Sequence, residues 1–211
     1  MDEATEQNIL KTGTTGLALR FKDGVVIAAD KRVSGGYVVK KDFDKIHMIT
    51  KNIGMAISGL VSDAMSLVDL MRAELRLYEF ENGFEANVKT TASLVGKICH
   101  QGYRSFQFYY VQLIIGGADE TGGHIFTVDP SGAVSEDNYM VIGSGSLFSL
   151  SKLEDGWKDN MTKEEAVKLA KTALSLSVSR DLYTGDGMDF YVITKDKVDH
   201  TKLTLKTVEV Q

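Results

Sequence analysis

Apolar and polar residues alternate at 17–22 near the start of the chain, a pattern that is typical of a strand. Residues 14–22 and 24–30 are rich in apolar and β-branched side chains, and Lys22-Asp23-Gly24 between them is typical of a tight turn. This pattern predicts a β-hairpin. The further strands predicted before Gly59 are 37–39, paired with 45–49, and 53–58.

Helical periodicity replaces this alternation after Gly59. From Asp63 to Tyr78 apolar residues recur every three or four positions with charged residues opposite them, which predicts an amphipathic helix, and 86–102 is predicted to form a second. Thr162 and Glu165 have the spacing of a capping box, in which each side chain satisfies a free backbone amide of the helix start. The helix that begins there is expected to run through Leu176.

The remaining apolar runs predict strands at 111–117, 123–129, 188–194 and 203–208, the first two as a hairpin. Strands, two helices, strands, a helix and strands follow one another in that order. Such an order predicts an α+β fold with helices outside a sheet or a pair of sheets. The chain contains no repeat, linker or low-complexity tract, so a single domain is expected.

Composition narrows the function classes. The 211 residues are 43% hydrophobic and 25% charged with a net charge of -5, which is ordinary for a globular protein and disfavours nucleic-acid binding. No apolar stretch approaches the length of a membrane helix. The single cysteine, Cys99, allows no internal disulfide and indicates an intracellular, cytoplasmic protein. The four histidines, His47, His100, His124 and His200, lack metal-ligand spacing, so neither a metal nor a cofactor is expected.

The residue with the most informative chemistry is Thr14. A threonine can act as a nucleophile when cleavage before it frees its own α-amine as the base, and that amine has an ordinary pKa of about 7.7 to 8, close to working pH. The preceding segment, residues 1–13, is short and polar, carries three acids and ends in Gly13, so it is not a secretory signal. We therefore expect this segment to be a leader that is removed.

Several motifs share one order and spacing with a known family. They are Gly13-Thr14-Thr15, the run from Asp23 to Arg32, Lys45-Ile46, the run from Ser58 to Asp63, the run from Gln112 to Gly117, Gly143-Ser144-Gly145-Ser146, and Arg180-Asp181 through Gly185. On these blocks the chain resembles the proteasome β-subunit family, and most of all its archaeal members, from Gly13 onward. The resemblance implies a four-layer α/β/β/α sandwich of the N-terminal-nucleophile hydrolase type. It also implies an autocatalytically removed propeptide at 1–13 and one hydrolase domain at 14–211.

The resemblance further implies a threonine endopeptidase and assigns its parts. Thr14 would attack the peptide carbonyl, Lys45 would ease its deprotonation, and Asp30 would hold Lys45 charged. The backbone amide of Gly59 would be the oxyanion donor. The residues that would orient the terminal amine are Asp181, Ser144 and Thr184.

Substrate contacts are implied by the same resemblance. Ser34 and Ser58 would pair their backbone with an extended peptide, as an added strand does. The positions that match the specificity pocket are Val33, His47, Ile57, Val61 and Met65. Mostly apolar walls favour an apolar or aromatic side chain before the cleaved bond.

The implied partners are proteasome α subunits and other β subunits in stacked heptameric rings, an unfolded polypeptide as substrate, and a regulatory ATPase acting through the α ring. A catalytically silent structural subunit of the same barrel is the alternative, in which Asp30 and Lys45 form only a structural ion pair. The bacterial two-ring relative and an α-type subunit are disfavoured. The sequence also disfavours a phosphate-binding role for the loop at Ser144, because this loop lacks the P-loop lysine, and it disfavours a thiol protease at Cys99-His100.

Overall fold

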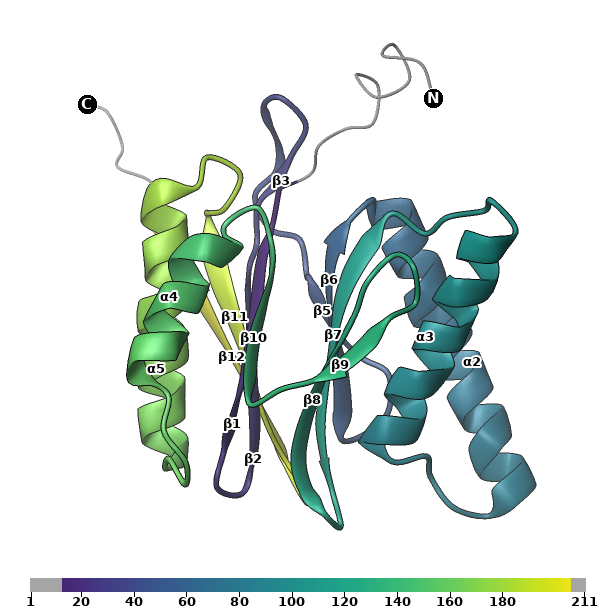
Figure 1. Ribbon diagram of the computed structural model, residues 1–211. Coiled ribbons are helices and arrows are strands. Elements are labelled where there is room, and N and C mark those ends of the chain that lie inside the picture. Colours follow the sequence, from purple (N-terminus) through teal and green to yellow (C-terminus); the bar gives the residue numbers. More distant parts are fainter. Residues whose placement is uncertain (1–12, 206–211) are drawn as a thin grey trace.

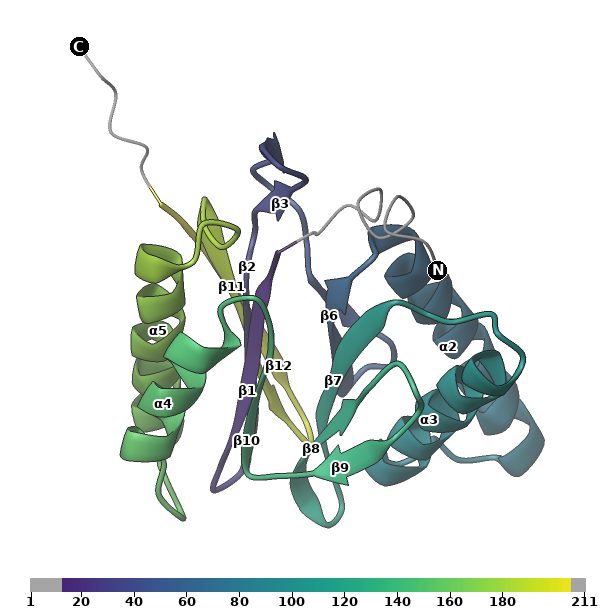
Figure 2. The same cartoon turned by 45° about the horizontal axis from the view of Figure 1, so that its top comes forward.

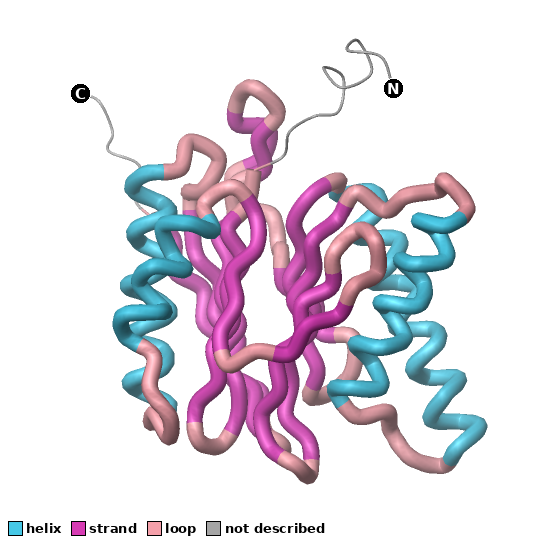
Figure 3. The backbone as a smooth tube through the Cα atoms, in the orientation of Figure 1, coloured by secondary structure: helices cyan, strands magenta, loops and turns pink. Residues whose placement is uncertain are grey.

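The computed structural model describes residues 13–205. Two antiparallel five-stranded sheets lie face to face, and a pair of helices covers the outer face of each (Figure 1). The tube in Figure 3 makes the four layers plain, with helices at both sides and strands between them. The predicted α+β class and the four-layer α/β/β/α arrangement are confirmed.

The first sheet has the strand order β10-β1-β2-β11-β12. Its strands are β1 (Thr15–Phe21), β2 (Gly24–Asp30), β10 (Tyr139–Gly143), β11 (Gly187–Thr194) and β12 (Val198–Thr204). β1 and β2 pair from Gly16 opposite Ala29 to Phe21 opposite Gly24, which is the predicted hairpin. Every residue of β2 is buried, so this strand lies at the centre of the molecule.

The second sheet has the order β5-β6-β7-β8-β9. Its strands are β5 (Ile46–Met48), β6 (Ile53–Gly59), β7 (Val111–Asp119), β8 (Gly122–Val128) and β9 (Val134–Glu136). A separate two-stranded ribbon is formed by β3 (Val33–Ser34) and β4 (Val38–Lys40). The predicted hairpin of 111–117 with 123–129 is present as β7 and β8.

Two helices pack on each sheet. Those on the second sheet are α2 (Val61–Asn82) and α3 (Val88–Arg104), and those on the first are α4 (Ser146–Gly156) and α5 (Lys163–Arg180). The predicted apolar stripe of the first helix is its buried face, with Leu67, Val68 and Met71 fully enclosed against the second sheet. The capping box of α5 is formed as predicted, because Thr162 accepts from the amide of Glu165 while the Glu165 carboxylate accepts from the amide of Thr162.

Three apolar layers result from this stacking. One lies between α2, α3 and the second sheet, one between α4, α5 and the first sheet, and one between the two sheets. Ile27, Ile114 and Ile125 fill the middle layer and are completely buried. Burying side chains of this size contributes about 1.5–3 kcal/mol each.

The predicted pairing of 37–39 with 45–49 is wrong. β4 instead pairs with β3, and β5 pairs with β6. The ribbon of β3 and β4 closes a loop of only a few residues, which costs less chain entropy than a pairing across the 41–45 segment.

Four elements were missing from the sequence prediction, namely β3, β9, β10 and α4. α4 packs Leu150 and Leu153 against the core of the first sheet, but its first turn exposes Leu147 and Phe148, and its N-cap, Gly145, offers no side chain that marks the helix start. The last strand begins at Val198 and ends at Thr204, whereas 203–208 was predicted. Residues 206–208 lie outside the described part of the chain. The mostly polar face of β12 hides its strand character from a search for apolar runs.

The capping box gives a test of how local sequence stabilises this fold. Thr162→Ala removes the hydroxyl that accepts from the Glu165 amide and is expected to lower the free energy of unfolding by about 1 kcal/mol. Thr172→Ala is the matched control, since Thr172 lies exposed within the same helix and its hydroxyl only returns to the Lys168 carbonyl. Urea denaturation of both variants checks this. Equal loss of stability in the two would contradict the assigned role of the cap.

Candidate active site

The ends of several strands and helices meet beside the first residue of β1. The start of β1, the end of β2, the loop between β10 and α4 and the turn after α5 all lie at the end of the molecule that carries the β3–β4 ribbon (Figures 1 and 2). Thr14 directly precedes β1 and is 4% exposed. The fold therefore brings together polar residues that are far apart in the sequence.

The hydroxyl of Thr14 points at the carbonyl that precedes it. Oγ1 of Thr14 donates to the Gly13 carbonyl oxygen at 2.9 Å, and Nζ of Lys45 donates to the same oxygen at 3.3 Å. Lys45 also donates to Oδ1 of Asp30 at 2.8 Å. Two donors thus polarise the peptide bond between Gly13 and Thr14, and a cation is placed next to the hydroxyl.

Asp30 anchors this arrangement from the end of β2 and is completely buried. Besides Lys45, its carboxylate accepts from the backbone amides of Thr15 at 2.9 Å, Arg32 at 3.0 Å and Gly185 at 3.0 Å. Burial lowers the pKa of Lys45, and the Asp30 carboxylate opposes that shift. A buried ammonium keeps its proton only with such a partner, so Asp30 sets the charge as well as the position of Lys45.

A second carboxylate lies on the other side of Thr14. Oδ2 of Asp181 accepts from Oγ of Ser144 at 2.6 Å and from the hydroxyl of Thr184. Ser144 in turn accepts from the backbone nitrogen of Thr14 at 3.2 Å. Because Thr184 gives its proton to Asp181, the contact of 2.7 Å between the Thr15 and Thr184 hydroxyls has Thr15 as its donor. The nitrogen of Thr14 is thereby connected to Asp181 through one serine.

Two glycines are required by close approach. A Cβ added to Gly13 would lie 1.7 Å from Cβ of Tyr183, so no other residue fits before Thr14 without movement. Gly59 has φ +111°, and its added Cβ would lie 2.1 Å from the Tyr110 carbonyl oxygen. The backbone of Gly59 can therefore lie at the pocket beside Thr14 only because it carries no side chain.

A small cavity of about 10 Å³ opens next to Thr14 and Lys45. Three of the five predicted pocket residues line it, namely Val33, Ile57 and Val61. Its other walls include Ser58 and Gly59, which were predicted, and Phe43 and Ala64, which were not.

His47 and Met65, by contrast, do not line this cavity. Met65 packs against the core under α2. His47 is partly buried, and burial followed by the charge of Arg72 lowers its pKa. Ser34 is buried, and its hydroxyl has no hydrogen-bond partner among residues 13–205. Only Phe43 and Ala64 are additions to the predicted set, and the segment 41–45 that carries Phe43 has no regular structure that a pattern could reveal.

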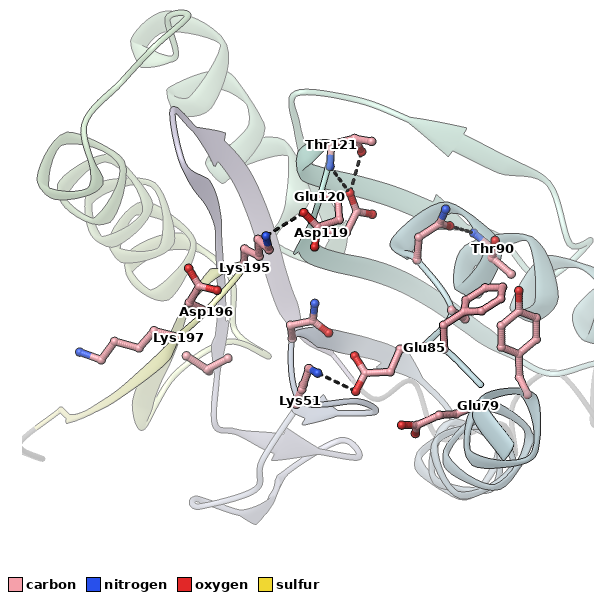
Figure 4. A pocket seen from close by; sticks show the side chains of 16 residues that line it. Lys51, Glu79, Glu85, Thr90, Asp119, Glu120, Thr121, Lys195, Asp196 and Lys197 are labelled. Carbon is pink, nitrogen blue, oxygen red and sulfur yellow. Dashed lines mark hydrogen bonds and ion pairs between the residues drawn. The ribbon is translucent and has the colours of Figure 1, made fainter. Parts of the chain in front are cut away.

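A groove with a volume of about 940 Å³ lies elsewhere, and several of the charged side chains that line it form ion pairs (Figure 4). Lys51 contacts Glu85 at 2.9 Å, and Lys195 contacts Glu120 at 2.7 Å. Cys99 is buried, and burial raises the pKa of its thiol to about 11, which keeps it protonated. Neither feature offers an activated nucleophile.

Within residues 13–205 no group of three or more acidic, histidine or cysteine side chains is arranged to hold a metal ion. Among the described helices, none is both long enough and apolar enough to cross a membrane.

Comparison with known proteins agrees with the fold. Residues 10–193 match the family model described as Proteasome subunit. The chain is 43% identical to Proteasome subunit beta of Haloferax volcanii over 190 residues, and this alignment covers 90% of the chain and 76% of that protein. It is 39% identical over 197 residues to Proteasome subunit beta of Methanocorpusculum labreanum, and the alignment covers 92% of each protein. It is also 39% identical over 181 residues to Proteasome subunit beta 2 of Korarchaeum cryptofilum, where the alignment covers 85% of this chain and 91% of that protein. The chain therefore belongs to the proteasome subunit family, among its β subunits.

Proposed function

We propose that this chain is a catalytic β subunit of a proteasome core particle and that Thr14 is its nucleophile. It would cleave unfolded polypeptides as a threonine endopeptidase of the proteasome endopeptidase complex class. The observation that carries the proposal is the position of Thr14 between two carboxylate-centred groups. Its hydroxyl shares the Gly13 carbonyl with the Lys45–Asp30 pair, and its nitrogen contacts Ser144, which is bound to Asp181.

The first step in this proposal is removal of residues 1–13. Oγ of Thr14 attacks the carbonyl carbon of Gly13, while Lys45, which donates to the carbonyl oxygen, stabilises the negative charge that develops there. The bond between that carbon and the Thr14 nitrogen breaks, the nitrogen takes up the proton that the hydroxyl has lost, and an ester to Oγ1 remains. Water hydrolyses the ester, which releases the leader as a carboxylate and leaves Thr14 with a free α-amine and a free hydroxyl.

The second step uses the new amine as the base. It accepts the proton of the Thr14 hydroxyl as Oγ attacks a substrate carbonyl, and later passes the proton to the departing amine. Ser144 contacts the nitrogen and donates to Asp181, which also accepts from Thr184, and these three residues would orient the amine. Lys45 and Asp30 would lower the cost of negative charge on Oγ1. The amide of Gly59 is the proposed oxyanion donor, which its place in the wall of the cavity beside Thr14 supports.

Substrate would lie as an extended strand along the backbone of Ser34 and Ser58, with the side chain before the cleaved bond in the cavity. The partners in this proposal are α subunits and further β subunits in stacked heptameric rings, with a regulatory ATPase acting through the α ring in the cytoplasm. Enclosure in such a particle would supply the selectivity that one small apolar pocket lacks.

The competing hypothesis is a catalytically silent structural subunit, and a comparison of two Thr14 variants with the wild-type chain distinguishes it from a catalytic subunit. Thr14→Ala is expected to keep the leader and to lower peptide hydrolysis by at least about 10⁴-fold, since it removes the nucleophile. Thr14→Ser, which keeps a hydroxyl and an α-amine, should lose the leader and retain hydrolysis. Intact mass and peptide turnover after co-assembly with the α partner measure both effects. A wild-type chain that stays at full length and is inactive in that assembly would identify the silent subunit.

The pocket gives a prediction about cleavage preference. The cavity of about 10 Å³ holds about one water molecule and has Phe43 in its wall. We therefore narrow the expected preference from apolar or aromatic residues before the cleaved bond to small apolar residues. Phe43→Ala should raise kcat/KM for substrates with an aromatic residue before the cleaved bond by roughly tenfold, compared with its effect on substrates that have alanine at that position. Phe84→Ala is the control, because Phe84 is an exposed phenylalanine at the remote groove. An unchanged preference in Phe43→Ala would remove this residue from the specificity site.

A further inference from the structure

A second charged cluster lies directly beside the candidate active site and none of its members has a role in the proposed chemistry. Its centre is Lys31, the residue after Asp30, whose side chain is only 6% exposed. Nζ of Lys31 lies 2.8 Å from Asp42, 2.5 Å from Asp44 and 3.0 Å from Asp189. One buried ammonium therefore joins β2 to β11 and to the 42–45 segment.

The carboxylates of this cluster differ in their surroundings. Asp189 lies on β11 and is 2% exposed, and its other oxygen lies 3.3 Å from the imidazole of His200. Asp42 and Asp44 are 83% and 51% exposed. Asp44 has a second cation, since Nζ of Lys202 on β12 donates to the same oxygen at 2.9 Å. Asp44 is thus the member on which two lysines converge.

The segment held by this cluster carries two residues of the site. Residues 41–45 have no regular secondary structure, so their position depends on contacts with the rest of the chain. The amide of Phe43 donates to the Lys31 carbonyl at 3.1 Å, and the Lys45 carbonyl accepts from the Ile57 amide at 2.9 Å. Phe43 lines the cavity and Lys45 contacts Asp30 and the Gly13 carbonyl. Asp30, the last residue of β2, and Lys31, which follows it, therefore hold opposite ends of the same short segment.

We propose that Lys31 and Asp44 are positioning residues, which fix the 42–45 segment so that the Lys45 ammonium reaches Asp30 and the carbonyl before Thr14. This inference rests on the proposed function, because it acts through Lys45. Burial lowers the pKa of Lys31, but the three carboxylates outweigh burial and raise it overall, so the central cation stays charged. The hydrogen bonds from Lys31 and then Lys202 lower the pKa of Asp44, which keeps its carboxylate ionised at neutral pH.

Asp44→Asn is the variant that tests the proposal, since Asp44 is half-exposed and its replacement leaves the buried Asp189 paired with Lys31. The control is Asp199→Asn. Asp199 lies on β12, the edge strand that carries Lys202, and also binds two lysines, Lys163 and Lys197, neither of which belongs to the cluster around Lys31. Asp44→Glu restores the charge at the same position.

In the assembled particle, Asp44→Asn is expected to lower kcat for a small peptide by about tenfold with KM within about twofold, because a displaced ammonium weakens the chemical step. Asp44→Glu should recover most of kcat, and Asp199→Asn should leave it unchanged. Hydrogen exchange supplies a readout that needs no activity. The amides of residues 42–46 should exchange faster in Asp44→Asn and at the wild-type rate in Asp199→Asn.

Different outcomes would overturn the proposed function and the positioning role of Lys31 and Asp44. Hydrolysis that persists in Thr14→Ala, or an inactive wild-type particle, overturns the proposed function, while the exchange measurement still reports on the segment. A wild-type particle that is active, together with an Asp44→Asn particle that matches Asp199→Asn in kcat and in exchange, overturns the positioning role of Lys31 and Asp44.

Discussion

The buried ion pair between Asp30 and Lys45 is the interaction on which the arrangement around Thr14 depends. Neither side chain is more than 3% exposed, and their charged atoms lie 2.8 Å apart. A buried carboxylate without partners is costly, but Asp30 accepts from three backbone amides as well as from Lys45. Removing one member of such a pair typically costs about 3–5 kcal/mol, because the other charge is left uncompensated. The pair therefore resists displacement and holds a cation beside a hydroxyl.

The layered fold supplies the frame for this pair. Asp30 ends the fully buried central strand β2, whereas Lys45 comes from an irregular segment that reaches β2 through tertiary contacts. Thr14 precedes β1, the hairpin partner of β2. The pair of sheets thus fixes Thr14 and Asp30, whereas Lys45 depends on further contacts for its place. Functional groups at the ends of strands and on adjoining loops are the usual consequence of such a frame.

Much of this could be read from the sequence. Two apolar, β-branched runs around a tight turn revealed the β1–β2 hairpin. Helical periodicity revealed α2, α3 and α5, because each of these helices buries one face. The ordered motifs pointed to Thr14, Asp30, Lys45 and Asp181, which the structure places around one another. Their catalytic roles remain the proposal that experiments must decide.

The misses share one cause, which is dependence on contacts distant in sequence. Phe43 lines the cavity because Lys31 holds its segment, and no local pattern records that contact. His47 and Met65 were placed in the pocket by resemblance, but their side chains lie outside the cavity in this chain.

The central claim is that the α-amine of Thr14 is the base of the reaction. The most direct measurement is peptide turnover by the processed particle before and after acetylation of that amine, with peptide mapping to establish that Thr14 carries the acetyl group and Lys45 does not. The account predicts that turnover stops while the particle stays assembled. Turnover at the original rate by the acetylated particle would contradict it.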